Sequence, residues 1–137
     1  MIMPLLTWNE NMMIGIQSID NQHQRWIDLI NDLHETMQRG KGSEAINQTL
    51  ASMLDYTRVH FSDEEKLLST HSYPGYVQHK QLHDGFINRI KELQDRLQKG
   101  HIILTISVMK SLRDWLKNHI QKVDRQYAPF LKSKGIV

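Results

Sequence analysis

Cysteine is absent from this chain of 137 residues. Its absence excludes a disulfide framework, a thiolate zinc site and a cysteine-ligated iron–sulfur cluster. A chain without cysteine fits a reducing compartment, and we expect a cytoplasmic protein. At this length we expect a single domain, which is large enough to enclose a real hydrophobic core.

Long apolar runs and clustered charges are lacking as well. Residues 1–6 contain no basic segment followed by a long apolar run, so the sequence predicts neither a signal peptide nor a membrane span. The formal net charge is only +2 with histidine counted as neutral, and basic residues are interspersed with acidic ones. We expect no nucleic-acid partner, because proteins that bind nucleic acids carry a basic patch.

Glycine and proline are scarce, with seven and three residues, and they gather at short joints between longer segments. Their scarcity favours long helices over many short strands. Between the joints, apolar residues recur every three or four positions, as they do on the buried face of a bundle helix. We call each such row an apolar stripe. The helices predicted in this way span about residues 18–39, 43–69, 72–99 and 102–119.

Short joints make consecutive helices antiparallel, so the sequence predicts an all-α fold, an up-down-up-down four-helix bundle. Ser18 is the expected N-cap of the first helix, and Pro74 is expected in the first turn of the third. The bundle should span about 18–123. An extended N-terminal arm over about 1–17 precedes it, and a short C-terminal segment over about 124–137 follows it.

Histidines and carboxylates accompany the apolar stripes. His79 and His83 are spaced i, i+4, which places both side chains on one face of a helix. The same spacing separates His60 from Glu64. An unpaired His or Glu on a buried stripe is costly, which argues against the alternative of scattered surface histidines. The candidate ligands are His23, His60, Glu64, His79, His83, His119 and Asp124.

The candidate ligands lie near the beginning of the first and third helices and near the end of the second and fourth. In an antiparallel bundle these four helix ends meet at one end of the molecule. Five imidazoles and two carboxylates suit a borderline first-row metal such as iron, and they are numerous enough to hold two ions.

Asp124 follows His119 by five residues, which in an α-helix points the two side chains about 140° apart. We therefore expect the fourth helix to kink or unwind near 120–123, with a short irregular cover over 127–131. The other three histidines lie too far along their helices to join the candidate ligands, or they lie in a joint. Structural or solvent-facing roles are expected for His34, His71 and His101.

Several of these residues stand in motifs that closely resemble the hemerythrin family, in particular its single-domain bacterial members. The resemblance covers nearly the whole chain and fills all seven ligand positions of the family with the expected residue types. The motifs are Ile19-Asp20-Asn21-Gln22-His23, His60-Phe61 with Glu64-Glu65, His79-x-x-x-His83, and Asp114-Trp115-Leu116-Lys117-Asn118-His119-Ile120 followed by Asp124, together with Trp8.

The resemblance implies a non-haem centre of two iron ions, joined by an oxo or hydroxo group and by two bridging carboxylates. One ion has three histidine ligands. The other has two and keeps an open position, where dioxygen binds. In this sequence the three histidines would be His79, His83 and His119, the two would be His23 and His60, and the bridges would be Glu64 and Asp124.

The implied function is reversible dioxygen binding for transport, storage or delivery to an oxygen-consuming enzyme, rather than catalysis. Ferritin-like di-iron enzymes use more carboxylates and a Glu-x-x-His motif. In this sequence no histidine stands three residues after Glu64 or Glu65. The alternatives are an oxygen-sensing signalling module, although the chain has no room for a fused transducer domain, and a slow peroxidase or nitric oxide scavenger. The expected walls of the oxygen pocket are Leu116, Phe61, Ile120 and Trp26.

Overall fold

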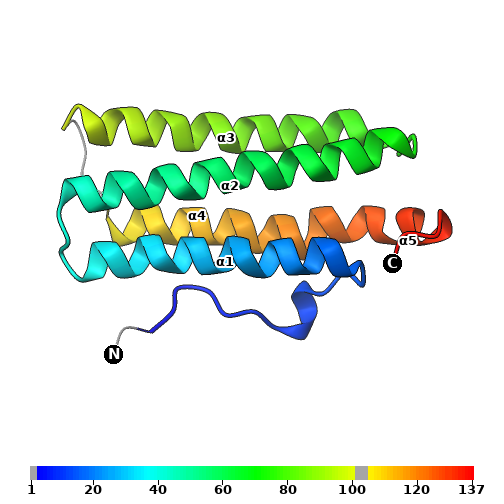
Figure 1. Ribbon diagram of the computed structural model, residues 1–137, viewed down its shortest axis with the longest axis horizontal. Helices are drawn as coiled ribbons and strands as arrows, with labels where there is room; N and C mark the ends of the chain where they lie inside the picture. Colours follow the sequence, from blue (N-terminus) through cyan, green and yellow to red (C-terminus); the bar gives the residue numbers. More distant parts are fainter. Residues whose placement is uncertain (1–2, 101–104) are drawn as a thin grey trace.

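The computed structural model describes residues 3–100 and 105–137, and every regular element within these ranges is a helix. The bundle consists of four long helices, which Figure 1 shows side by side, each running opposite to the one before it. This arrangement confirms the predicted antiparallel four-helix bundle. In the described ranges we find no helix with the length and apolar character needed to span a membrane. The four are α1 (Gln17–Gln38), α2 (Ser43–Thr70), α3 (Tyr76–Gln98) and α4 (Ile106–Asn118).

The beginning of α1 differs from the prediction. Ser18 lies inside the first turn, and the N-cap position before it forms no side-chain hydrogen bond. The Asp20 carboxylate instead accepts hydrogen bonds from the backbone N–H groups of Ile14 (2.9 Å) and Gly15 (3.1 Å). The prediction of Ser18 as N-cap is therefore wrong, because a carboxylate within the first turn organises the entry to the helix.

The predicted place of Pro74 in the first turn of α3 is also wrong. Ser72 has a positive φ of 58°, and the N–H of Tyr73 donates to the carbonyl of Leu68 at 2.9 Å. A residue in the left-handed region commonly closes a helix in this way. Pro74 therefore lies in the connecting turn before α3. The predicted beginning of the fourth helix, near Ile102, lies outside the described residues.

Beyond α4 the chain stays helical instead of breaking. A π-helix, η2 (His119–Asp124), leads directly into a further α-helix, α5 (Arg125–Ser133), which contains Pro129. The prediction of an irregular cover over 127–131 is therefore wrong. The segment stays helical although it contains Pro129, because α5 buries one face against the arm and the ends of α1 and α2. This second core consists of Ile14, Ile16, Ile19, Leu68, Tyr127, Ala128 and Leu131.

The N-terminal arm runs along the bundle beside α1 (Figure 1). It contains one turn of 3-10 helix, η1 (Glu10–Met12). Leu6 and the side chain of Asn31 form two hydrogen bonds. The backbone N–H of Leu6 donates to Oδ1 of Asn31 at 3.0 Å, and Nδ2 of Asn31 donates to the backbone carbonyl of Leu6 at 2.8 Å. Trp8 packs against the main core and remains partly exposed. The arm is thus held to α1 by hydrogen bonds between its backbone and the side chain of Asn31, as well as by apolar contact.

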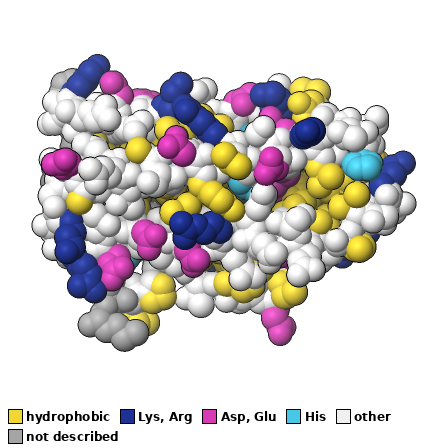
Figure 2. All heavy atoms as spheres, in the orientation of Figure 1, with side chains coloured by type: hydrophobic (Ala, Val, Ile, Leu, Met, Phe, Trp, Pro, Cys, Tyr) yellow, Lys and Arg dark blue, Asp and Glu magenta, His cyan; other side chains and the backbone are white. Residues whose placement is uncertain are grey.

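The apolar stripes of the long helices meet in one main core, as predicted. Leu33 of α1, Leu50 of α2 and Ile90 of α3 are all fully buried. Trp26 is the largest of the fully buried side chains, and its indole N–H donates to the hydroxyl of Thr57 at 2.9 Å. On the face shown in Figure 2, side chains of both charge signs are mixed with apolar ones.

Thr57→Val should lower the free energy of unfolding by about 1–3 kcal/mol, because the Trp26 indole N–H would remain buried without its acceptor. Valine nearly matches threonine in shape, so most of the loss reports on the hydrogen bond. Urea unfolding followed by tryptophan fluorescence measures the change. Thr70→Val at the exposed end of α2 is the control. A Thr57→Val variant as stable as the parent would show that the indole finds another acceptor.

Candidate metal centre

The candidate ligands lie at the end of the bundle that the arm and α5 cover. Each side chain comes from the buried face of its helix, and the exposed fractions range from 0 to 4%. The structure therefore brings together all seven residues that the sequence singled out. They are His23 from α1, His60 and Glu64 from α2, His79 and His83 from α3, and His119 and Asp124 from η2.

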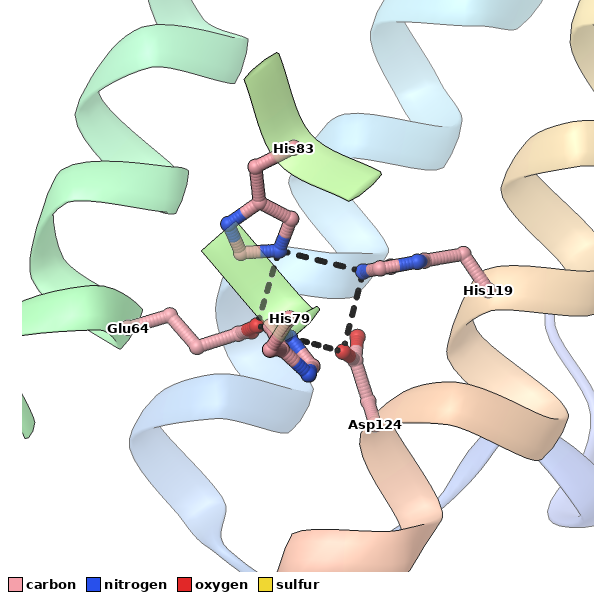
Figure 3. A group of neighbouring side chains, drawn as sticks. All are labelled: Glu64, His79, His83, His119 and Asp124. Atoms are coloured by element: carbon pink, nitrogen blue, oxygen red, sulfur yellow. Dashed lines mark hydrogen bonds and ion pairs between the residues drawn. The ribbon is translucent and has the colours of Figure 1, made fainter. Parts of the chain in front are cut away.

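The seven side chains form two overlapping groups. Within each group, one nitrogen or oxygen of every residue lies within 4.8 Å of the others. The two carboxylates belong to both groups, and the larger group is drawn in Figure 3. To Glu64 and Asp124 the larger group adds His79, His83 and His119, and the smaller group adds His23 and His60.

Each oxygen of Asp124 faces a different group of histidines. Oδ1 lies 3.0 Å from Nε2 of His79 and 3.1 Å from Nε2 of His119. Oδ2 lies 3.0 Å from Nε2 of His23. The carboxylate therefore presents one oxygen to each side, which is the disposition of a carboxylate between two cations.

Glu64 divides its oxygens in the same way. Oε1 lies 2.5 Å from Nε2 of His79 and 3.2 Å from Nε2 of His83. Oε2 lies 3.4 Å from Nε2 of His60 and 3.9 Å from Nε2 of His23. Glu64 and Asp124 thus stand side by side between the three histidines of one group and the two of the other.

The π-helix explains how Asp124 reaches the site. In an α-helix, His119 and Asp124 would point about 140° apart. The wider turn of a π-helix is closed by i→i+5 hydrogen bonds, so residues five positions apart come close to sharing a face. The unwinding that the sequence predicts near 120–123 therefore takes the form of a widened turn within a continuous helix.

The electrostatics of the metal-free site are those of a buried anionic pair surrounded by imidazoles. Burial by itself would lower the pKa of His23 and His79, but Asp124 and Glu64 raise it to about 9 in both. Burial lowers the pKa of His60 to about 4. Burial would raise the pKa of both carboxyl groups, yet the surrounding histidines hold it well below the ordinary value. Both carboxylates therefore stay ionised and favour a cation.

The protein's own groups leave this cluster unsatisfied. Several buried atoms of the cluster form no hydrogen bond within the described residues, although Nε2 of His23 and Oδ2 of Asp124 lie 3.0 Å apart: both ring nitrogens of His23, Nε2 of His60 and both oxygens of Asp124. The Nε2 atoms of His83 and His119 face each other at 3.1 Å. Buried polar atoms ordinarily have partners, and a cation accepts the lone pairs that converge here. The residues therefore fit bound metal.

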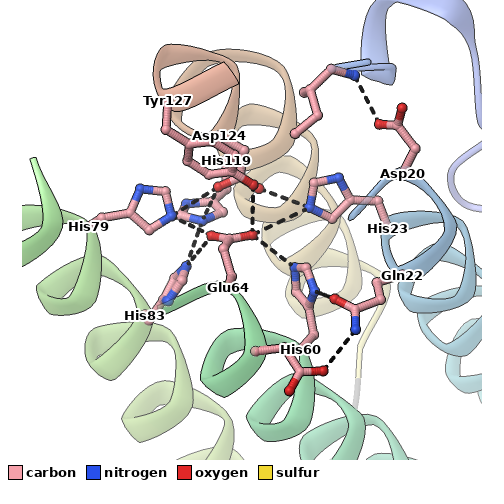
Figure 4. Close-up of polar contacts among 12 residues, drawn as sticks. Asp20, Gln22, His23, His60, Glu64, His79, His83, His119, Asp124 and Tyr127 are labelled. Atoms are coloured by element: carbon pink, nitrogen blue, oxygen red, sulfur yellow. Dashed lines mark hydrogen bonds and ion pairs between the residues drawn. The ribbon is translucent and has the colours of Figure 1, made fainter. Parts of the chain in front are cut away.

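Two residues outside the cluster contact the Nδ1 atoms of His60 and His83, and Figure 4 shows the first of them, Gln22, beside His60. Gln22 Oε1 lies 2.7 Å from Nδ1 of His60, and Glu65 Oε2 lies 2.8 Å from Nδ1 of His83. Such partners fix the proton on Nδ1 and leave Nε2 free to bind a metal. Sequence reasoning did not assign them this role, although each directly neighbours a candidate ligand along the chain.

The covering helix α5 reaches the site through Tyr127. Its hydroxyl donates to Oε2 of Glu64 at 3.0 Å, and its ring lies 5.4 Å from that of His79. Burial raises the pKa of Tyr127 well above its ordinary value, so the hydroxyl keeps its proton and acts as a donor. The sequence does not predict this contact, because a segment expected to be irregular has no defined inward face.

Aromatic rings enclose the imidazoles. Phe61 stacks on His83 with ring centroids 3.7 Å apart. Trp115 stacks on His119 with ring centroids 4.6 Å apart. Trp115 is not among the residues predicted to form the walls of an oxygen pocket. The residues predicted as walls of an oxygen pocket are at most 1% exposed and belong to the main core: Leu116, Phe61, Ile120 and Trp26.

The other described histidines lie apart from both groups. His34 is buried on α1, where its Nε2 lies 3.4 Å from Nε2 of Gln38. His71 follows the last residue of α2 as its C-cap and is partly exposed. His101 lies outside the described residues.

Comparison with known proteins gives a consistent family match. The family model described as the hemerythrin HHE cation binding domain matches residues 14–131. A bacteriohemerythrin of Stenotrophomonas maltophilia is 38% identical over 134 residues, which are 96% of this chain and 84% of that protein. A bacteriohemerythrin of Methylococcus capsulatus is 33% identical over 132 residues, which are 96% of this chain and 100% of that protein.

Solved structures agree with the sequence matches. A wild-type hemerythrin crystal structure superposes with a TM-score of 0.86 at 32% identity, covering 91% of this chain and 96% of that one. A hemerythrin variant with one leucine replaced by alanine superposes with a TM-score of 0.87 at 31% identity, covering 93% and 97%. With its buried cluster of histidines and carboxylates, the chain belongs to the hemerythrin family.

Proposed function

We propose that this protein binds dioxygen reversibly at a centre of two non-haem iron ions, for transport, storage or delivery to an oxygen-consuming enzyme. The observation that carries the proposal is the division of the Glu64 and Asp124 oxygens between two groups of histidines. Two carboxylates that each face both groups suit a pair of ions held close together.

The donor set favours iron. Imidazole suits iron, zinc, copper and nickel, whereas purely oxygen-based sites suit magnesium and calcium. When bound, two ferrous ions supply the two electrons that reversible dioxygen binding requires. The larger group offers three histidines to one ion and the smaller group offers two to the other, which leaves room for an external ligand. The ligands would be His79, His83 and His119 for one ion, and His23 and His60 for the other.

The protein's own contribution is to hold these donors rigidly and to exclude water. Phe61 and Trp115 stack on ligand rings, and Leu116 and Ile120 are at most 1% exposed in the same core. A dry, apolar surrounding limits proton delivery to a bound ligand, which favours release of the ligand unchanged. Few carboxylates and many neutral imidazoles also favour binding over oxidative catalysis. We therefore propose a carrier rather than an enzyme.

Protein produced aerobically with ample iron should contain two iron ions per chain, because seven ligands in two groups exceed what one ion can use. Elemental analysis measures the content, and absorption spectra of aerobic and deoxygenated protein report on dioxygen binding. A single metal ion per chain, or zinc in place of iron, would rule out the proposed centre.

Glu64→Ala and Asp124→Ala should each leave about one iron ion or fewer per chain, because each carboxylate faces both groups. His34→Ala is the control, since His34 is buried on α1 but belongs to neither group. Its iron content should equal that of the parent. If either carboxylate variant retains both ions, that residue does not bridge them.

Leu116→Asn should still load iron but should lose its oxygenated spectrum several times faster, with release of peroxide, because the amide brings a hydrogen-bond donor into an apolar position. Leu116→Met keeps the position apolar and should decay at nearly the parent rate. Stopped-flow absorption measures both. Equal decay in all three proteins would show that Leu116 does not shield the ligand. Rapid, sustained peroxide turnover by the parent would instead favour an enzyme.

A further inference from the structure

An exposed carboxylate is connected to the buried centre through one amide group. Gln22 of α1 is partly buried and lies between two residues of α2. Its Oε1 lies 2.7 Å from Nδ1 of His60, and its Nε2 donates to Oδ2 of Asp63 at 2.9 Å. Figure 4 shows Gln22 beside His60, with its amide group facing the imidazole ring. Asp63 itself is exposed and touches no candidate ligand among the described contacts.

The direction of these hydrogen bonds follows from the chemistry of the groups. An ionised carboxylate only accepts hydrogen bonds, so the amino group of the Gln22 amide must face Asp63. The carbonyl oxygen of the same amide must then face His60, and it can only accept. His60 is therefore required to carry its proton on Nδ1. Its Nε2, which lies on the side of Glu64, is left with a free lone pair.

We propose that Asp63 is a positioning residue for the centre: by orienting the amide of Gln22 it selects the tautomer of His60 that can bind a metal through Nε2. The inference rests on the proposed function, because only a ligand role makes this tautomer matter. Without Asp63, the amide of Gln22 can turn over and offer its amino group to Nδ1. That orientation favours the opposite tautomer, in which Nε2 carries the proton and cannot bind.

The geometry also shows why an indirect contact is needed here. His83 obtains the same constraint directly from a carboxylate, since Glu65 Oε2 lies 2.8 Å from its Nδ1. Beside His60 the equivalent place is taken by an amide from a different helix, and an amide has no fixed direction by itself. Asp63 supplies the missing direction. Because Gln22 directly precedes His23, the same contact joins α1 to α2 at both histidines of the smaller group.

The test substitutes Asp63→Asn in the full-length protein. An asparagine can donate as well as accept, so the amide of Gln22 loses its fixed orientation. In metal-free protein labelled with ¹⁵N-histidine, the parent should show His60 protonated on Nδ1 only. The variant should show a mixture of the two tautomers. Anaerobic titration with ferrous iron should show about 10-fold weaker binding of one of the two ions, as is usual when the outer partner of a ligating histidine is lost.

Two further variants separate orientation from structure. Asp55→Asn, an exposed carboxylate earlier on α2, should change neither the His60 spectrum nor iron binding. The combination Gln22→Glu with Asp63→Asn reverses the pair, so that the new carboxylate accepts from Nδ1 of His60 and from the new amide. It should restore the Nδ1 tautomer and most of the iron affinity, which a merely structural contact between the helices would not predict.

The outcomes decide between the two proposals. An unchanged His60 tautomer in Asp63→Asn, with the parent's unfolding midpoint, would overturn the role of Asp63 whatever the protein binds. Failure of the reversed pair to restore the tautomer would overturn it as well. A parent protein that binds no ferrous iron, yet shows the expected tautomers, would overturn the proposed function and leave the orientation of Gln22 by Asp63 standing.

Discussion

The sharing of two buried carboxylates between two groups of imidazoles is the constraint on which this structure depends. Glu64 and Asp124 each point one oxygen toward each group, and both carboxylates are buried. Five histidines must approach them from four helices, which only a bundle with its helix ends in register provides. The antiparallel topology, the widened turn of η2 and the cover of α5 all serve this one arrangement.

This arrangement carries a cost for the metal-free fold. The ring nitrogens of His23 and both oxygens of Asp124 are buried and lie close together, but they form no hydrogen bond in the described chain. Burying such groups opposes folding. The rest of the bundle offsets that cost with an uninterrupted core around Trp26, Leu50 and Ile90. A metal that binds only the folded protein adds to stability by mass action, so ligand and scaffold support each other.

Residue periodicity predicts the bundle and the convergence of the ligands, because both depend on which face of a helix is apolar. It does not predict what depends on hydrogen bonds to backbone or on distant packing. Ser18 looks like an N-cap, but Asp20 organises the entry to α1 through two backbone N–H groups. An irregular cover is expected over 127–131 after the break in the fourth helix, yet burial of Tyr127 against the arm keeps α5 helical. The role of Gln22 depends on a neighbour 41 positions away, which no local pattern contains.

The two groups of histidines differ in the residues that contact their Nδ1 atoms. Glu65, a carboxylate, contacts His83, whereas Gln22, a neutral amide, contacts His60. A carboxylate that accepts from Nδ1 makes an imidazole a stronger donor than a neutral amide does. In the proposed centre, His83, which contacts Glu65, would therefore give more electron density to its ion than His60, which contacts Gln22, would give to the other. The ion held by three histidines would have more protein ligands and stronger donors. The ion held by two would have fewer ligands and weaker donors, so the proposal places an external ligand on that ion.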